Sequence, residues 1–375
     1  MIAGILRESG DEKRVALLPA EAAAVIKLGL KVVVEEGAGT GAFASDELYR
    51  TAGASTATRR EVVSGADVLF TVNPPLEDDI SLYREGQLIF TVLDPVANRD
   101  WLEKARQRKL TVMALDLVPR ITRAQSMDIL SSMATVSGYK AVLEAASLLP
   151  RFFPMFMSAA GTIKPARVLI LGAGVAGLQA IAVARKLGAV VEVFDVRSAV
   201  RDEVKSLGGK FIEVEGARED AAAGGYAVEQ TEDFRKRQQE LIQERAAAAD
   251  VIIATAQIPG KKAPVLVLKD TVTRMKPGSV IIDLAASSGG NCELTENGKT
   301  IMAGGVTIAG RSEYPAAMSS DASKMFGNNV VNLLKIMTDG KGIVNPDFTD
   351  EIVAGTAAVH GGEYLSPRVK QLLDI

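Results

Sequence analysis

The sequence predicts an α/β protein with two doubly wound parallel-sheet domains, joined by long helices and separated by a cleft. Short β-branched runs alternate with alanine-rich helical stretches from the first residue onward, which is the pattern of parallel strands linked by crossover helices. A length of 375 residues suits two domains of about 150 residues each. Near mid-chain, a glycine-rich turn separates a predicted strand from a predicted helix.

Composition excludes several classes of protein. With 47% hydrophobic and 24% charged residues, the chain is neither disordered nor a disulfide scaffold. A net charge of −3 gives no reason to expect nucleic acid or an anionic membrane as a partner. The single cysteine, Cys292, fits a reducing cytoplasm and allows no cysteine-based metal site, so no metal is expected. The single histidine, His360, is expected to be a surface or packing residue.

The first domain is expected to contain five short apolar strands, at residues 2–6, 31–35, 68–72, 88–93 and 110–115. Residues 19–29 predict a helix with Pro19 at its start and Gly29 just past its end. A proline-free helical pattern runs from about Ala124 to Leu149, ends at Pro150 and is expected to bridge the two domains.

A second series of strands is expected at residues 167–171, 190–195, 210–214, 251–254, 279–284 and 306–309. Six strands with helices between them make a complete doubly wound sheet. The last stretch, residues 321–375, contains one clear helix at 322–337 and ends that read as loops. Because it is too short to fold alone, we expect it to pack on the first domain, which gives a discontinuous N-terminal domain, 1–131 plus 318–375, and a Rossmann domain at 132–317.

The longest uncharged apolar run, residues 168–184, could be mistaken for a membrane span. Three glycines and Gln179 interrupt it, and Arg167 and Arg185 flank it. It divides better into a strand, a turn and a helix. The N-terminus has no signal-peptide pattern, and no membrane segment is expected.

The turn Gly172-Ala173-Gly174-Val175-Ala176-Gly177 carries the strongest functional signal. Its first glycine permits a tight turn, its second allows a pyrophosphate close to the backbone, and its third lets helix and strand pack closely. The helix N-terminus then offers N–H groups to the phosphates. Asp195 ends the next strand, where a carboxylate binds the ribose hydroxyls of NAD and repels the 2′-phosphate of NADP, so NAD(H) is the predicted cofactor.

Two further segments complete the predicted cofactor site. Arg197, close to Asp195, leaves open a contact with a 2′-phosphate instead. Tyr226 lies in residues 216–230, a polar segment too long for an ordinary connection, which is either disordered surface or a lid over the nucleotide. The predicted cofactor-binding residues are Gly172, Ala173, Gly174, Val175, Ala176, Gly177, Asp195, Val196, Arg197, Gly225, Tyr226, Thr255 and Ala256.

Polar side chains also gather at a predicted strand-to-helix junction, residues 119–132, which contains Arg120, Gln125, Asp128 and Ser131. Asp128 and Ser131 are three apart and would share one face of a helix. Spacing alone leaves open a capped helix start with a surface ion pair or a functional site.

Several stretches recur together in one known family. They are Arg7-Glu8, Lys13-Arg14-Val15-Ala16 with Pro19, residues 119–132, the glycine turn, Gly224-Gly225-Tyr226-Ala227 and residues 276–285. On these motifs nearly the whole chain resembles the alanine dehydrogenase and pyridine nucleotide transhydrogenase family. The run Arg123-Ala124-Gln125-Ser126-Met127-Asp128 is similar to the transhydrogenase branch.

The resemblance implies the NAD(H)-binding component of a proton-translocating NAD(P) transhydrogenase. It implies that Arg120, Gln125, Asp128 and Ser131 line the nicotinamide end of the cleft, and that Tyr226 belongs to a loop that moves over the nucleotide. It also implies a homodimer, an NADP(H)-binding domain on a beta subunit, and membrane-embedded subunits that translocate protons. A separate alpha-1 subunit ending at Ile375 would then be cytoplasmic and held at the inner membrane by its partners.

The chemistry separates this function from its alternatives. Alanine dehydrogenases need a substrate lysine near Asn73 and a catalytic histidine near Asp94, and both are absent. Oxidising an amino acid releases a proton and requires a general base. Hydride transfer between two nicotinamides exchanges no proton at the reacting carbons, so positioning and exclusion of water suffice. A self-sufficient NAD-dependent amino-acid or keto-acid dehydrogenase and a non-catalytic NAD-sensing or scaffold protein remain as alternatives.

Overall fold

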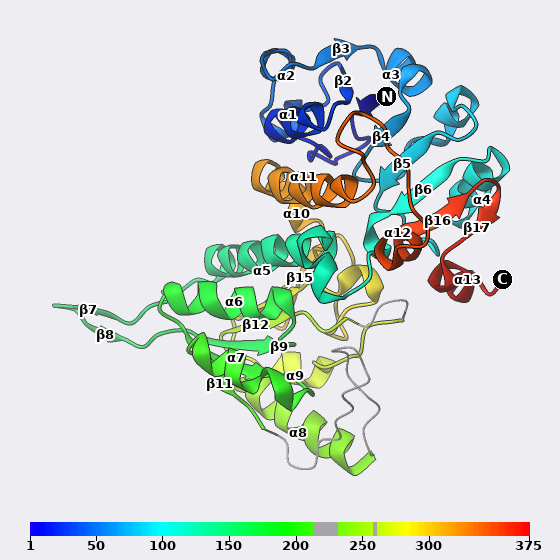
Figure 1. Cartoon of the computed structure of the whole chain (residues 1–375). Helices are drawn as coiled ribbons and strands as arrows, with labels where there is room; N and C mark the ends of the chain where they lie inside the picture. Colours follow the sequence, from blue (N-terminus) through cyan, green and yellow to red (C-terminus); the bar gives the residue numbers. More distant parts are fainter. Residues whose placement is uncertain (214–231, 258–260) are drawn as a thin grey trace. The chain divides into compact units, whose positions relative to one another are not determined.

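The computed structural model describes residues 1–213, 232–257 and 261–375 (Figure 1). The chain divides into two compact units, one made of Met1–Met133 with Pro315–Ile375 and the other of Ala134–Tyr314. The division falls inside helix α5 (Ile129–Leu148), so this helix belongs to both units. The first unit is built from two stretches that are far apart in the sequence.

An eight-stranded sheet forms the centre of the first unit, in the order β17-β16-β6-β5-β4-β1-β2-β3. The six strands β1 to β6 are parallel, with Ile2 opposite Lys31 and Ala3 opposite Val68. The last two strands add an antiparallel edge beside β6. The strands are β1 (Ile2–Ile5), β2 (Lys31–Glu35), β3 (Ser55–Ala57), β4 (Val68–Phe70), β5 (Leu88–Thr91), β6 (Thr111–Ala114), β16 (Ala357–His360) and β17 (Glu363–Tyr364).

Both faces of this sheet are buried, which explains why its strands read as continuous apolar runs. Along β4, Val68 and Phe70 face one core cluster and Leu69 faces the other, as the two-residue period of a strand requires. Residues of α1 and α11 belong to the first cluster, and residues of α3, α4 and α13 belong to the second. The helices therefore cover the sheet from both sides, as Figure 1 shows.

The helices of the first unit start where local sequence allows it. Pro19 occupies the first turn of α1, where a missing N–H costs little, and Thr58 with Glu61 forms a capping box at α3. The helices and 3₁₀ turns are α1 (Pro19–Lys27), η1 (Thr40–Ala42), α2 (Asp46–Thr51), α3 (Arg59–Gly65), η2 (Glu77–Leu82), α4 (Arg99–Gln107), η3 (Leu115–Leu117), η4 (Thr122–Met127), α11 (Ser319–Lys335), α12 (Glu351–Thr356) and α13 (Pro367–Leu373).

The second unit contains a seven-stranded sheet in the order β11-β10-β9-β12-β13-β15-β14, parallel except for β14. Counted along the chain, its six parallel strands have the same order as β1 to β6 of the first unit, with the order reversing beside the first strand. The strands are β9 (Arg167–Leu171), β10 (Val190–Phe194), β11 (Lys210–Phe211), β12 (Val251–Ala254), β13 (Val280–Asp283), β14 (Thr300–Ala303) and β15 (Val306–Ala309).

Helices also cover this sheet on two faces, around two separate core clusters. They are α5, α6 (Val175–Lys186), η5 (Ser198–Val200), α7 (Arg201–Ser206), α8 (Glu232–Ala248), α9 (Lys269–Arg274), η7 (Ala286–Ser288) and the start of α10 (Tyr314–Ala317). A separate hairpin of β7 (Phe156–Ser158) and β8 (Gly161–Ile163) lies away from the sheet.

The α/β class and the two doubly wound sheets are confirmed, and each expected strand is present within a few residues of its predicted ends. The apolar run 168–184 divides into β9, a turn and α6. Among the described residues, we find no helix with the length and apolarity that crossing a membrane requires.

Two predictions about local structure were wrong. The long helix does not begin near Ala124, because a 3₁₀ turn comes first and α5 starts at Ile129. The segment after α11 does not end in loops, since β16 and β17 extend the first sheet and α12 and α13 flank them. The strand β16, Ala-Ala-Val-His, is too short and too rich in alanine to give a strand signal of its own.

Candidate nucleotide-binding site

The glycine turn lies at the carboxyl end of β9, beside the point where the strand order reverses. Gly172 has a φ of 101°, a conformation that favours glycine, and its N–H donates to the carbonyl of Phe194 at 2.8 Å. A Cβ on Gly177 would lie 1.9 Å from the carbonyl oxygen of Gly172, so only glycine lets α6 start this close to the strand. The predicted roles of the first and third glycines therefore have a steric basis in the structure.

Gly174 differs from the other two glycines. It is the N-cap of α6, where it brings no side chain to cap the first turn, and a Cβ built on it would meet nothing within 4 Å. The first turn of α6 contains no acidic residue. The N-terminus of this 12-residue helix thus combines N–H donors, a positive dipole end and open space, which is what a pyrophosphate requires.

Asp195 follows β10 and is nearly buried, with 6% of its side chain exposed. One carboxylate oxygen accepts the N–H of Ala173 at 2.7 Å, so the acid also fixes the glycine turn. The guanidinium of Arg197 donates to both oxygens, at 2.9 and 2.8 Å, and these bonds raise the pKa of Arg197. Arg197 is therefore paired with the acid beside the site.

The residues after β12 close the other side of the turn. The hydroxyl of Thr255 donates to the carbonyl of Gly172 at 3.1 Å, and the backbone N–H of Thr255 donates to the carbonyl of Leu171 at 2.8 Å. A Cβ on Gly172 would lie 2.6 Å from this hydroxyl oxygen. The structure thus brings Gly172, Ala173, Asp195 and Thr255 together, whereas Gly225 and Tyr226 lie outside the described residues.

In the first unit, Asp128 and Ser131 meet at the start of α5. The Asp128 carboxylate accepts the N–H of Ser131 at 2.9 Å and its hydroxyl at 2.6 Å. This is the capped helix start that spacing alone had left open. Arg120 and Gln125 are exposed.

The turn η4, which carries Gln125, is held on both sides by the C-terminal stretch. The amides of Asn329 and Asn332 on α11 donate to the carbonyl of Ser126 at 2.8 and 3.1 Å. Arg123 donates to both oxygens of Asp350, the N-cap of α12, at 2.7 and 3.0 Å. The structure therefore gives the C-terminal stretch a role in fixing the position of Gln125.

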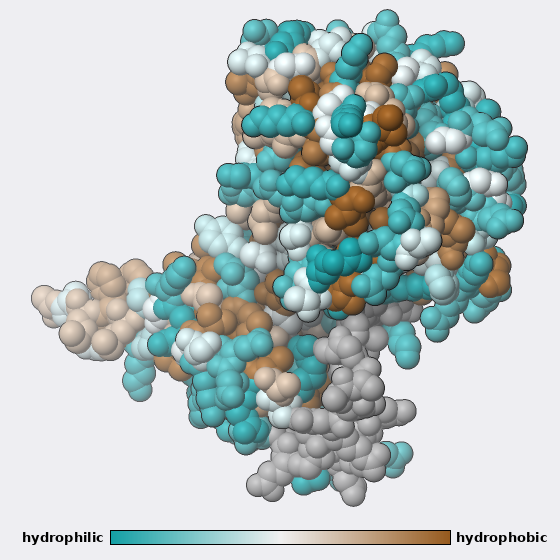
Figure 2. All heavy atoms as spheres, viewed as in Figure 1, coloured by the Kyte–Doolittle hydropathy of each residue, from teal (hydrophilic) through white to brown (hydrophobic). Residues whose placement is uncertain are grey.

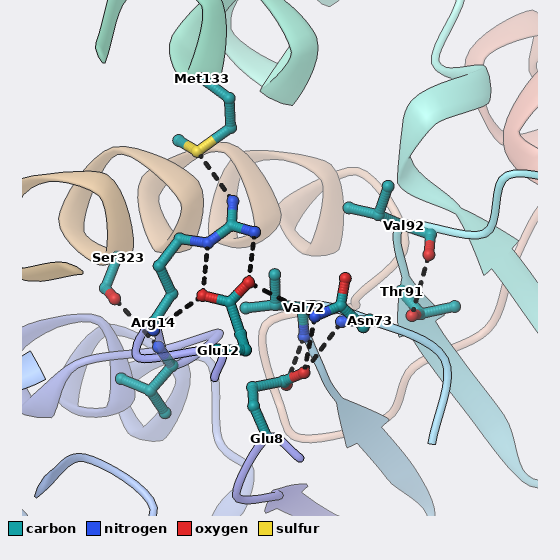
Figure 3. A network of polar contacts seen from close by, with 10 residues as sticks. Glu8, Glu12, Arg14, Val72, Asn73, Thr91, Val92, Met133 and Ser323 are labelled. Atoms are coloured by element: carbon teal, nitrogen blue, oxygen red, sulfur yellow. Dashed lines mark hydrogen bonds and ion pairs between the residues drawn. The ribbon is translucent and has the colours of Figure 1, made fainter. Parts of the chain in front are cut away.

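A polar network at the carboxyl end of β1 and β4 received no role from the sequence. The Glu8 carboxylate accepts the N–H groups of Val72 and Asn73, at 2.6 and 3.0 Å (Figure 3). Burial raises the pKa of Glu8 to about 7, against the lowering effect of these two bonds. Only the motif Arg7-Glu8 signalled this residue, and the motif alone could not reveal its partners.

Beside Glu8, Arg14 forms a two-point ion pair with Glu12, with nitrogen to oxygen distances of 2.8 and 2.6 Å (Figure 3). Burial would raise the pKa of Glu12, but the hydrogen bonds and charge of Arg14 outweigh it and keep this pKa below its usual range. Another Arg14 nitrogen points to the sulfur of Met133 at 3.2 Å. Arg14 is thus paired with Glu12, whereas Glu8 is held by backbone N–H groups.

Metal ligation and histidine chemistry would depend on other side chains. Among the described residues no group of histidine, cysteine, aspartate and glutamate side chains could hold a metal ion. Nδ1 of His360 lies 2.8 Å from the Thr111 hydroxyl and its ring packs on Phe348, as expected for a packing residue. The side-chain amide of Asn73, near which a lysine is expected in an alanine dehydrogenase, donates to Glu8 at 3.3 Å.

Comparison with known proteins adds to this geometry. Residues 4–137 match the family described as "Alanine dehydrogenase/PNT, N-terminal domain", and residues 141–367 match "Alanine dehydrogenase/PNT, C-terminal domain". The chain is 46% identical over 366 residues to the first part of the alpha subunit of NAD(P) transhydrogenase from Rhodospirillum rubrum, covering 95% of each chain.

Two solved structures share the fold over the whole chain. A transhydrogenase from Sinorhizobium meliloti has a TM-score of 0.89 at 41% identity, covering 97% of this chain and 100% of its own. An L-alanine dehydrogenase has a TM-score of 0.83 at 26% identity, covering 100% of this chain and 99% of its own.

Proposed function

The chain belongs to the alanine dehydrogenase/PNT family, and from this premise we propose that it is the NAD(H)-binding alpha-1 subunit of a transhydrogenase. In this proposal hydride passes directly between NADH on this chain and NADP⁺ on a partner subunit. The observation that carries it is the start of α6, which has open space at Gly174 and no side-chain cap, at the switch point of a doubly wound sheet.

The residues present fit a dinucleotide. The pyrophosphate would bind the N–H groups at the start of α6, and Asp195 would accept the adenosine ribose hydroxyls. Asp195 already bonds to Ala173 and Arg197, so ribose binding must share or displace the Arg197 contact. Val196 and the residues after β12 would complete the pocket wall. When bound, the reduced nicotinamide supplies the hydride, and the chain supplies orientation and exclusion of water.

We assign the positioning of the nicotinamide to Arg120, Gln125, Asp128 and Ser131. Asp128 and Ser131 bond to each other and cap α5, so they would act by fixing the backbone next to Gln125. Arg120 and Gln125 are exposed and are the candidates for direct contact. None of the four is a histidine or lysine base, which suits hydride transfer without proton exchange at the reacting carbons.

The proposal requires partners. The acceptor NADP⁺ would be held by the NADP-binding domain of a beta subunit, and proton translocation would belong to membrane-embedded subunits. A cytoplasmic chain would then be attached to the inner membrane only through these partners.

We propose that a second copy of the chain is also a partner, through the β7–β8 hairpin. Met155, Phe156 and Met157 on and beside it are 58%, 46% and 71% exposed, and the hairpin projects as a largely apolar patch in Figure 2. Phe152 and Phe156 stack with ring centroids 4.8 Å apart and add aromatic surface to this apolar patch.

Light scattering, which measures the mass of the particle in solution, tests whether two copies of the chain associate. The wild-type mass should be about twice the 39.6 kDa of one chain. Replacing both Phe156 and Met157 with serine should give single chains, whereas Met302→Ser, at a 74% exposed methionine of β14, should leave the mass unchanged. A wild-type mass of one chain would contradict the homodimer.

Hydride transfer tests the main proposal. The full chain is mixed with NADH and an oxidised NADP analogue, with and without the partner's NADP-binding domain. Transfer only with the partner supports the proposal. Turnover of alanine, pyruvate or glyoxylate by the chain alone would favour the self-sufficient dehydrogenase, and NADH binding without any transfer would favour a sensor or scaffold.

A further inference from the structure

A buried carboxylate organises the loop that follows β13. The side chain of Asp283, with none of its surface exposed, accepts the N–H groups of Ala285, Asn291 and Cys292, at 3.0, 2.7 and 3.0 Å. It also accepts the hydroxyl of Thr295 at 2.6 Å. A buried carboxylate this well satisfied fixes the path of the backbone that donates to it. Asp283 therefore holds Asn291 in place.

Asn291 carries this order to the loop after β12. It is also fully buried, and its side-chain oxygen accepts the N–H of Ala256 at 3.0 Å. Its amide nitrogen donates to the carbonyls of Ala256 and Pro264, at 2.9 and 2.8 Å. One side chain thus satisfies both backbone groups of Ala256, in place of a neighbouring strand.

Ala256 follows Thr255 in the sequence, and Thr255 is bonded to the glycine turn. The Thr255 hydroxyl donates to Gly172, where the space between the two residues is too small for a Cβ. A shift of the backbone at Ala256 would therefore be transmitted to the turn, because Thr255 is the next residue and its hydroxyl lies against Gly172. The path from Asp283 to Gly172 consists of hydrogen bonds and one peptide link.

We infer that Asp283 and Asn291 are positioning residues that set the place of Thr255 and Gly172 for the dinucleotide. This inference rests on the proposed NAD(H) binding at the turn. In the part of the chain that the structure describes, no hydrogen bond joins either residue to the turn, so both act through Ala256 and Thr255.

The same unit offers a matched control. Gln243 is another buried amide, 8% exposed, whose nitrogen donates to Leu266 at 2.8 Å and whose oxygen accepts the Thr271 hydroxyl at 2.6 Å. Like Asn291 it ties loop backbone to the rest of the unit. Within the described residues its own hydrogen bonds do not reach Thr255, Ala256 or the glycine turn. Its partner Leu266 donates its N–H to the backbone carbonyl of Asn291 at 2.7 Å, a bond that does not involve the Asn291 side chain. The loss of Gln243 should therefore reduce stability but move the cofactor site less than the loss of the Asn291 amide does.

The experiment measures NADH binding to the full chain by the fluorescence of the reduced nicotinamide, together with thermal unfolding. Asn291→Ala and Gln243→Ala should lower Tm by comparable amounts. Asn291→Ala should also raise the Kd for NADH by about ten-fold, whereas Gln243→Ala should change it less than about two-fold. Equal affinities in the two variants would overturn the inference.

Replacements of Thr255 keep the test decisive if Asn291→Ala does not fold. Thr255→Val removes the hydroxyl that reaches Gly172 and should weaken NADH binding several-fold, while Thr255→Ser keeps the hydroxyl and should restore it. Wild-type affinity in both would contradict the positioning path. A wild-type chain that binds no NADH would instead reject the proposed function, so the two failures are distinguishable.

Discussion

The two sheets have the same order of parallel strands but differ at the first crossover, where a doubly wound fold binds its ligand. In the second unit, β9 and α6 are joined by the short turn at Gly172–Gly174, and α6 begins without a side-chain cap. In the first unit, residues 6–18 separate β1 from α1, and the carboxylate of Glu8 lies at the carboxyl ends of β1 and β4. We call this switch point the first crevice and the one at the glycine turn the second crevice.

Charge reinforces this difference. The first turn of α1 contains the buried Glu21, whereas the first turn of α6 has no acidic residue. Burial raises the pKa of Glu21. An anion is therefore favoured at α6, whereas the first turn of α1 already contains a carboxyl group. Strand order thus creates a crevice in both sheets, and the residues of one short connection decide whether a phosphate can bind there.

The largest expected effect is on stability and concerns Glu8, whose carboxylate lies in the first crevice. Because the pKa of folded Glu8 is raised to about 7, the folded chain keeps a proton that the unfolded chain releases above about 4.5. The stability contributed by Glu8 should therefore be complete below pH 4.5 and fall by about 3 kcal/mol as pH rises through 7. Urea unfolding of wild type and Glu8→Gln between pH 4.5 and 8 should show this slope only in wild type.

Glu12→Gln is the matched control for Glu8. The pKa of Glu12 is lowered, so its contribution should be present above its ordinary pKa and lost as pH falls. If both variants changed the pH dependence of the free energy of unfolding in the same direction, this account of the first crevice would be contradicted.

In the second crevice, an added methyl group should obstruct the nucleotide. Gly174→Ala should raise the Kd for NADH by about a hundred-fold, because the methyl group would occupy the space next to the helix N-terminus where the pyrophosphate approaches. Tm should be unchanged, since Gly174 has a φ of −76° that alanine adopts freely. Calorimetry measures both affinity and stoichiometry.

Gly65→Ala is the control for this substitution, at an exposed glycine whose added Cβ also meets nothing within 4 Å. It should leave NADH binding unchanged. Saturable NADH binding with the wild-type Kd in Gly174→Ala would indicate a nucleotide site elsewhere and would contradict the distinction between the two crevices.

A third prediction assigns orientation to the first unit and binding to the second. Gln125→Ala should lower hydride transfer in the reconstituted complex by about ten-fold, because a misplacement near 1 Å is costly in rate. NADH affinity should stay within a few-fold of wild type, since the contacts at the glycine turn remain. A stopped-flow transfer rate equal to wild type would remove Gln125 from the site.

The smallest expected effect is on cofactor choice. Asp195→Asn removes the charge that opposes a 2′-phosphate and weakens the hold on Arg197, so NADPH should bind a few-fold more tightly. NADH should bind less tightly, because the carboxylate that would accept the ribose hydroxyls is lost. Equilibrium dialysis of both nucleotides measures the change in ratio, and an unchanged ratio would show that Asp195 does not select the cofactor.

The sequence by itself determined the features that depend on neighbouring residues. The two strand-helix series, Pro19 at the start of α1 and the glycine turn follow from periodicity and from glycine and proline geometry within about 30 residues. The spacing of Asp128 and Ser131 offered the capped start of α5 as one of two alternatives, and the structure shows the cap. The exact start of that helix was not readable from the sequence, because Asp128 competes as a cap with continued helix.

Only the tertiary structure decided how distant groups meet. Glu8 is bonded to residues more than 60 positions away, and β16 pairs with β6 across most of the chain. Asn291 reaches Ala256 because the sheet brings the ends of β12 and β13 to one edge. A buried carboxylate or amide must satisfy its hydrogen bonds with whatever lies beside it, and no pattern along the chain specifies those neighbours.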